Sequence, residues 1–133
     1  MERLQTIQFK FRHMIKTTLV LGASLNEDRY SNRAIKKLKA NNIAVVAIGL
    51  RKGIVDAVSI DTEQLPYENI DTVTLYLNPK RQEEYYRYIL SLMPRRVIFN
   101  PGTENSEFVK LLQENKIESE VACTLVLLAT NQY

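Results

Sequence analysis

The sequence predicts an α/β protein with a three-layer, Rossmann-like fold, in which helices flank a five-stranded, mostly parallel sheet. Short runs of β-branched and apolar residues recur along the chain, and helix-length segments with one apolar face separate them. Strands that alternate with crossover helices form a parallel sheet with right-handed connections. A chain of 133 residues fits one domain with a substantial core.

In the first half of the chain, residues 17–21 (TTLVL) have the pattern of a short buried strand. A helix is expected over residues 30–41, where apolar side chains fall on one face and lysines on the other. Residues 43–48 (IAVVAI) predict the second strand. Residues 50–71 are irregular, apart from a short strand expected near residues 54–58.

The second half continues with a strand over residues 72–77 (TVTLYL), which an Asn-Pro step ends. Residues 79–93 predict a helix, because aromatic and aliphatic side chains share one face. A strand at residues 97–99 and a helix at residues 107–115 follow. The last strand is expected over residues 117–122, with a closing helical turn behind it.

Composition excludes several classes of protein. No apolar run approaches the roughly 20 residues that a membrane-spanning helix needs. The single cysteine, Cys123, excludes an intramolecular disulfide framework and favours a cytoplasmic location. The single histidine, His13, excludes a Ser-His-Asp triad or a His/Cys metal cluster in the body of the chain. The sequence therefore shows no evident catalytic machinery.

The net charge of +3 arises near the N-terminus. Residues 1–16 contain four of the 18 basic side chains and one of the 15 acidic ones, so the rest of the chain is balanced. A nucleic-acid-binding protein needs a basic face on its folded body, which disfavours such a partner. We expect residues 1–15 to be an extension upstream of the domain or an amphipathic arm, and residues 16–133 to form the domain.

The residues that follow the strands are the candidate cofactor site, because ligands of doubly wound sheets bind outside the carboxyl ends of the strands. None of these loops carries a pair of convergent acids. The candidates are Gly22, Ala23, Ser24, Arg29, Tyr30, Ser31, Gly49, Leu50, Arg51, Lys52, Leu77, Asn78, Pro79, Asn100, Pro101 and Gly102.

Two of these loops point to a phosphorylated nucleotide. The backbone at Gly22 and the Ser24 hydroxyl can hold a phosphate at the start of a helix, although Gly22 can equally be only a turn and Arg29 a solvated charge. An NAD-selective site carries an acid after the second strand, whereas Arg51 and Lys52 occupy that place here. This basic pair suits a ribose-attached phosphate, as on NADP or coenzyme A, unless it is simply an exposed loop.

Cys123 follows the last predicted strand and also allows two interpretations. It is a small buried hydrophobic residue, or it is a thiol placed to meet the thiol or disulfide of a ligand.

Over roughly residues 16–125, these loops resemble the coenzyme A-binding domain family, which is related to the N-terminal domain of succinyl-CoA synthetase α-subunits. The family opens with G-A-S-x-N-x-x-R-x-S, and this chain has those residues from Gly22 to Ser31. Lys52, Asn78-Pro79 and Gly102 extend the likeness, and the family's closing segment commonly carries a cysteine, as Cys123 does here.

The resemblance implies that the first two strand-end loops hold the adenine and phosphates and that pantetheine passes the later loops. Two departures lie at the adenosine half: Ile48-Gly49-Leu50 replaces the usual V-N-P, and residues 53–65 lack the usual G-x-x-x-Y-x-S-L. The synthetase's phosphohistidine belongs to a separate domain that this sequence does not contain, so the resemblance implies binding without ligase chemistry.

We therefore expect a stand-alone domain that binds coenzyme A or acyl-CoA. Two alternatives are an NADP-binding, reductase-like protein and a non-catalytic interaction protein with a vestigial pocket. No nucleic acid or membrane partner is expected. A homodimer is considered because small single domains often form two-fold dimers.

Overall fold

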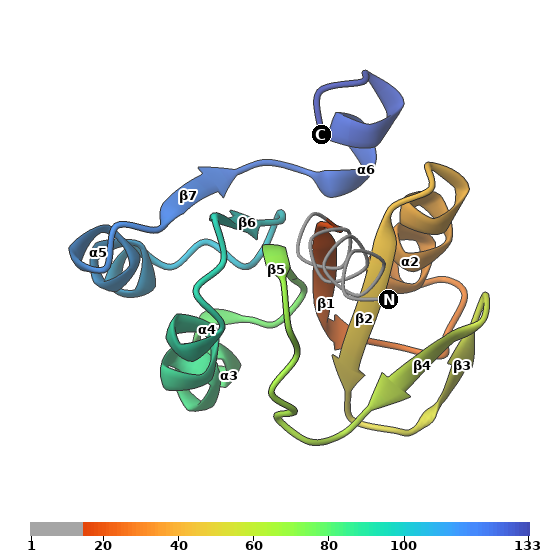
Figure 1. Cartoon of the computed structure of the whole chain (residues 1–133), viewed down its shortest axis with the longest axis horizontal. Coiled ribbons are helices and arrows are strands. Elements are labelled where there is room, and N and C mark those ends of the chain that lie inside the picture. Colours follow the sequence, from red (N-terminus) through yellow and green to blue (C-terminus); the bar gives the residue numbers. More distant parts are fainter. Residues whose placement is uncertain (1–14) are drawn as a thin grey trace, which may run out of the picture.

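The computed structural model describes residues 15–133 and shows one sheet with helices on both faces (Figure 1). The sheet has seven strands in the order β3-β4-β2-β1-β5-β6-β7. The strands are β1 (Thr17–Ala23), β2 (Ala44–Gly49), β3 (Gly53–Val55), β4 (Val58–Asp61), β5 (Ile70–Leu75), β6 (Arg96–Phe99) and β7 (Glu118–Val121). All neighbouring pairs are parallel except β3 and β4.

The predicted α/β, Rossmann-like fold is confirmed. The predicted N-terminal arm and His13 fall outside the described residues, except for Ile15.

The described residues form five α-helices, which are α2 (Tyr30–Ala40), α3 (Pro79–Gln82), α4 (Tyr86–Leu92), α5 (Ser106–Glu114) and α6 (Thr124–Ala129). Four of the five helices connect strands, and α6 follows the last strand. The expected helix over residues 79–93 is interrupted, because a short 3-10 segment, Glu83–Tyr85, separates α3 from α4. Asn78 starts α3 by accepting a hydrogen bond from the Arg81 backbone at 2.9 Å. Met93, in a left-handed conformation, ends α4.

The five predicted strands did not include the hairpin of β3 and β4. One short strand was expected near residues 54–58 of an otherwise irregular stretch, but those residues form the end of β3, the turn and the first residue of β4. Val55 pairs with Val58 across a two-residue turn. The turn residues, Asp56 and Ala57, both have positive φ, as tight hairpins require. Two short strands and an Asp-Ala turn lack the Asn-Gly or Asp-Gly signal by which a sequence shows such a hairpin.

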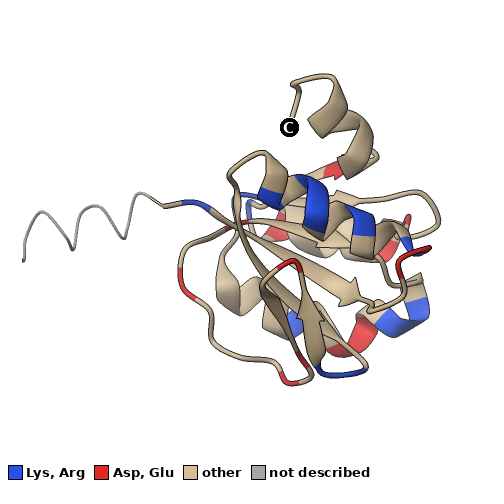
Figure 2. Ribbon diagram, turned by 90° about the vertical axis from the view of Figure 1, so that its right-hand side faces the viewer, with Lys and Arg blue, Asp and Glu red and all other residues tan. Residues whose placement is uncertain are grey.

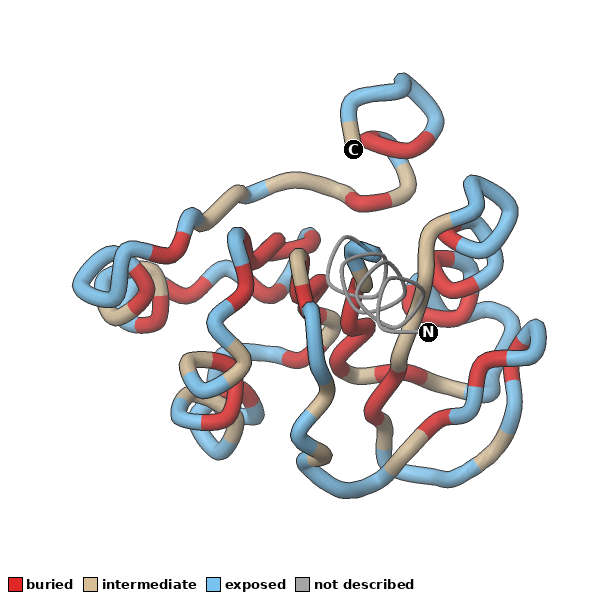
Figure 3. Tube along the Cα trace, viewed as in Figure 1, coloured by how far each residue is buried: buried red, intermediate tan, exposed pale blue. Residues whose placement is uncertain are grey.

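Alternate side chains of each central strand enter different cores, which explains the three layers. Leu19 and Leu21 join a cluster with Phe99 and Phe108 on the side of α4 and α5. Val20 joins the opposite cluster with Ile35 of α2. Because successive strand residues point to opposite faces, a strand that is covered on both sides is apolar throughout. Figure 3 shows this burial concentrated along the central strands.

Apart from Arg96 of β6, which is buried, the charged residues described lie on the outside of these layers or are only partly covered. Figure 2 shows basic positions along α2 and acidic ones scattered over the loops. No helix within residues 15–133 is long and apolar enough to cross a membrane.

Candidate functional site

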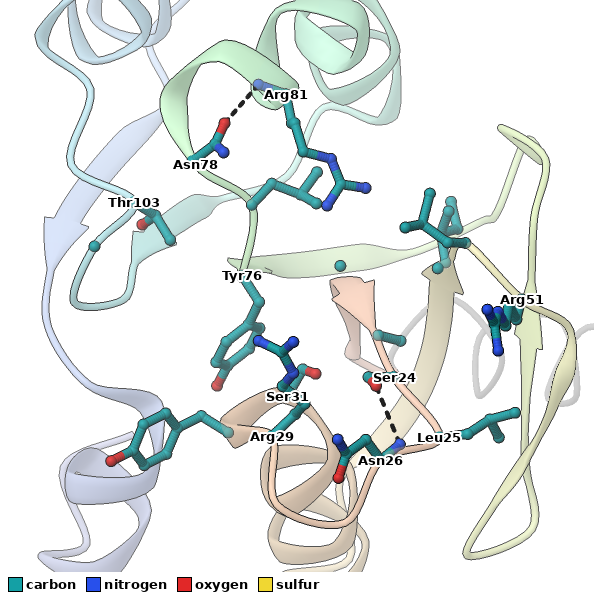
Figure 4. Close-up of a pocket in the computed structure, with 18 of the residues that line it drawn as sticks. Ser24, Leu25, Asn26, Arg29, Ser31, Arg51, Tyr76, Asn78, Arg81 and Thr103 are labelled. Carbon is teal, nitrogen blue, oxygen red and sulfur yellow. Dashed lines mark hydrogen bonds between the residues drawn. The ribbon is translucent and has the colours of Figure 1, made fainter.

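A cavity of about 550 Å³ lies at the carboxyl ends of the central strands (Figure 4). Its walls come from the loops that follow β1, β2, β5 and β6. The chain passes from β1 to β2 on one side and later returns to β5 on the other side of β1. The cavity therefore sits at the topological switch point, where doubly wound sheets bind their ligands.

Most of the candidate residues meet in this one cavity. Those that line it are Gly22, Ala23, Ser24, Arg29, Tyr30, Ser31, Gly49, Leu50, Arg51, Leu77, Asn78, Pro101 and Gly102. Four loops that are distant in sequence thus form one continuous wall.

Lys52, Pro79 and Asn100 do not line the cavity. Lys52 and Pro79 are exposed, and Pro79 is the first residue of α3. Asn100 is buried, and its amide donates to Thr74 Oγ1 at 2.7 Å and to the Leu75 carbonyl at 2.9 Å. Its side-chain oxygen accepts from the Thr124 backbone at 2.9 Å. Asn100 therefore joins β5, β6 and α6.

The cavity also contains residues that the sequence analysis did not select. They are Leu25, Asn26, Ile48, Tyr76, Arg81, Tyr85 and Thr103. Asn26 belonged to the quoted family motif, so that signal was available. Arg81 and Tyr85 lie further along the predicted helix than Asn78 and Pro79, the strand-end residues from which the site was predicted.

At the floor of the cavity, the backbone at the end of β1 closely approaches the backbone at the ends of β2 and β5. A Cβ atom on Gly49 would lie 2.2 Å from the Ala23 carbonyl oxygen. Gly22 has φ +98°, and its Cβ would lie 3.0 Å from the Tyr76 carbonyl group. Glycine is required at both positions, because any side chain would push the ends of β1, β2 and β5 apart.

The loop from β1 to α2 is fixed by its own polar groups. Ser24 Oγ accepts a hydrogen bond from the Asn26 backbone at 3.1 Å, and Asn26 Oδ1 accepts from the Asp28 backbone at 2.9 Å. The buried amide of Asn32 donates to the Ser24 carbonyl at 3.0 Å. These bonds present the loop in one conformation.

Helix α2 begins at the cavity without a side-chain cap. Arg29 is its N-cap residue and makes no capping hydrogen bond, and the first turn contains no acid. The first N–H groups of a helix have no intrahelical acceptors and carry partial positive charge. This end of α2 is therefore suited to an anion.

Three arginines from three separate segments of the chain reinforce that preference. Arg29, Arg51 and Arg81 line the cavity, and Figure 4 shows the guanidinium of Arg81 directed into it. No Asp or Glu among residues 15–133 lines the cavity. Burial raises the pKa of the neighbouring Tyr76 to about 12, so this side chain is a neutral hydroxyl at physiological pH.

The chemistry of these groups is that of a binding site for a polyanion. Within residues 15–133, no group of three or more His, Cys, Asp or Glu side chains could hold a metal ion. Cys123 is half-buried and does not line the cavity.

Comparison with known proteins agrees with this geometry. The family described as "CoA binding domain" matches residues 16–129. The crystal structure of an uncharacterized protein is 46% identical, with a TM-score of 0.86 over 90% of this chain and 98% of the other. No curated protein matches.

Two more distant structures share the fold. A Thermus thermophilus protein is 20% identical, with a TM-score of 0.80 over 95% of this chain and 98% of the other. A conserved hypothetical protein from Pyrococcus furiosus is 19% identical, with a TM-score of 0.74 over 84% of this chain and 97% of the other. The match over nearly the whole domain means that this chain belongs to the CoA-binding domain family.

Proposed function

We propose that this protein binds coenzyme A or an acyl-CoA in the cavity at the carboxyl edge of the sheet. The observation that carries the proposal is the meeting of three arginines with the uncapped start of α2, in a cavity that the described acids do not enter. Coenzyme A is a polyanion with a diphosphate and a separate ribose 3′-phosphate. A site with several separated cations and a helix N-terminus matches that charge distribution.

The central anion site suits the diphosphate. In this proposal, the first N–H groups of α2 and the Arg29 side chain hold its oxygens, and the Ser24 hydroxyl donates a further hydrogen bond. Gly22 lets the backbone approach closely because it carries no side chain.

Arg51 lies after β2 and suits the 3′-phosphate. Leu25 and Leu50 line the same side, with exposed fractions of 44% and 75%. Exposed apolar side chains at a cavity wall gain favourable contact when a flat adenine ring covers them. Leu50 belongs to the Ile48-Gly49-Leu50 segment that stands here in place of the family's usual V-N-P.

The loops after β5 and β6 would then flank the pantetheine arm. Asn78, Pro101 and Gly102 line that side of the cavity. We propose binding without catalysis, because the lining residues offer hydroxyl, amide and guanidinium groups but no carboxylate, imidazole or thiol.

Calorimetric titration of the purified protein with coenzyme A, dephospho-CoA and NADP tests the proposal. We expect coenzyme A to bind at least about tenfold more tightly than dephospho-CoA, because only coenzyme A has the 3′-phosphate to pair with Arg51. Equally weak binding of both would overturn the assignment. Tight binding of NADP that coenzyme A cannot displace would support the reductase-like alternative instead.

A further inference from the structure

Gln82 is a fully buried polar side chain next to the cavity, and it joins two of the cavity's loops. It is the last residue of α3 and has no exposed surface. Its Nε2 group donates to the Leu77 carbonyl and to the Thr103 carbonyl, each at 2.8 Å. Leu77 and Thr103 both line the cavity, one after β5 and the other after β6.

Two further side chains complete a hydrogen-bonded group with Gln82, which we call the amide brace (Gln82, Asn105 and Tyr86). Gln82 Oε1 accepts from Asn105 Nδ2 at 2.9 Å, and the same Nδ2 donates to the Tyr86 hydroxyl at 2.8 Å. Asn105 Oδ1 accepts from the Phe108 backbone at 3.2 Å and so caps α5. Every polar atom of the Gln82 side chain therefore has a partner, which a buried amide requires.

The sheet itself does not hold these two loops together. The ladder between β5 and β6 ends at the pairing of Leu75 with Phe99, and Asn100 adds one bond to the Leu75 carbonyl. Between the described residues 76–82 and 101–105, the hydrogen bonds that connect the loops all involve Gln82. Their spacing at the cavity therefore depends on this side chain.

We infer that Gln82 is a positioning residue for the ligand: it fixes the loops after β5 and β6 at the separation that the pantetheine arm needs. The inference rests on the proposed function. A site whose walls are already fixed loses less entropy on binding, so affinity falls when the brace is removed.

The chemistry at this position is specific to an amide. Only a side chain with two N–H hydrogens and an acceptor oxygen can satisfy two carbonyls and the Asn105 amide together. Methionine has similar length but would leave the Leu77 and Thr103 carbonyls without partners. Glutamate would place a buried acceptor against the same two carbonyls.

The test compares coenzyme A with a fragment, adenosine 3′-phosphate 5′-diphosphate, which keeps all three phosphates and lacks only the pantetheine arm, in calorimetric titrations of the full chain. We expect Gln82→Met to weaken coenzyme A binding about tenfold and to change binding of the fragment by less than about twofold. The matched control is Thr72→Val, since Thr72 is equally buried and its hydroxyl bonds Arg96 at 3.0 Å, away from the cavity. This control is expected to leave both affinities unchanged.

A loss of equal size for both ligands, or no loss in folded Gln82→Met protein, would overturn the inference while leaving coenzyme A binding intact. If wild-type protein does not bind coenzyme A, the proposed function itself fails. If Gln82→Met does not fold, Asn105→Asp is the second variant, because it keeps the capping oxygen and loses the donor to Gln82. It is expected to weaken coenzyme A binding about threefold, again without affecting the fragment, and unchanged affinity would contradict the brace.

Discussion

Arg51 and Lys52 are neighbours after β2 with the same charge, yet only Arg51 lines the cavity. The sequence offered both as a basic pair for a ribose phosphate. Arg51 lies in the bend that follows β2, whereas Lys52 directly precedes β3, is exposed and does not line the cavity. We therefore expect only one residue of this pair, Arg51, to contact the ligand.

Replacing Arg51 with glutamine is expected to weaken coenzyme A binding about tenfold, because a charge-assisted bond to the 3′-phosphate is lost. Binding of dephospho-CoA is expected to stay the same, since it lacks that phosphate. Lys52→Gln is the matched control and should change neither affinity. Calorimetric titrations measure all four constants, and an equal loss in the two variants would show that only the overall charge matters.

Gly49 decides how closely β1 and β2 approach. Because its Cβ would lie 2.2 Å from a backbone oxygen, Gly49→Ala is expected to destabilise the fold by roughly 1–3 kcal/mol. The three atoms nearest to a Cβ on Gly53 all belong to the side chain of Leu25, which is exposed and can move aside. Gly53→Ala is therefore the control, with a change in stability below about 0.5 kcal/mol. Urea denaturation compares the two, and equal losses would contradict the role of the Ala23 carbonyl.

At the scale of elements, helix α2 is less stable at its first turn than a capped helix would be. Its N-cap is an arginine without a capping bond, although serine, threonine, asparagine or aspartate would satisfy one of the free N–H groups. Helix α5, which starts next to the amide brace, does have an asparagine cap. Helices α4 and α6 also begin without a side-chain cap. The start of α2 lies at the cavity, where a ligand can supply the missing acceptor.

Arg29→Ser is expected to stabilise the unliganded protein by about 1 kcal/mol, because serine caps the helix. The same change should weaken coenzyme A binding, since a cation is removed and the serine competes for the N–H groups that would bind the diphosphate. Thermal denaturation without ligand and calorimetric titration with coenzyme A give the two readouts. A variant that loses stability, or that binds coenzyme A as before, would argue against an anion site at this helix.

The elements also show what sequence reasoning could and could not find. The apolar runs before Gly22 and at IAVVAI were recognisable because strands buried on both faces contain little else. The hairpin at Asp56-Ala57 was not, since its turn lacks glycine or asparagine. Gln82 looked like an ordinary helix residue, because its partners, Leu77 and Thr103, come together only in the folded chain.

At the scale of the whole molecule, one sheet orders four loops along a single edge, and two apolar cores hold it in place. Most residues that were chosen because they follow a strand therefore line one cavity, although their contacts could not be known from the sequence. The compartment and the homodimer do not follow from the sheet, and both stay predictions from the sequence.

At the edge of the sheet opposite the cavity, polar contacts at the start of β5 make the free energy of unfolding depend on pH. Asp71 of β5 lies 3.0 Å from the Arg95 guanidinium, and Thr72 Oγ1 donates to it at 2.8 Å. Burial alone would raise the pKa of Asp71, but the hydrogen bonds from Arg95 and Thr72 outweigh it and hold the pKa below its ordinary value. A carboxylate with a depressed pKa stabilises the fold above its unfolded-state pKa, and this contribution disappears as the pH falls through the folded-state value.

We therefore expect Asp71→Asn to lower the free energy of unfolding at neutral pH by less than about 1 kcal/mol, because Arg95 is half exposed and water screens the pair. The difference from wild type should shrink steadily as the pH falls below about 4, where the wild-type carboxylate also becomes neutral. Glu118→Gln removes a second, more exposed partner of Arg95, at 3.6 Å, and should have a smaller effect at every pH. Urea denaturation across this range measures the curves, and a difference that grows at low pH would mean that the charge of Asp71 destabilises the folded protein.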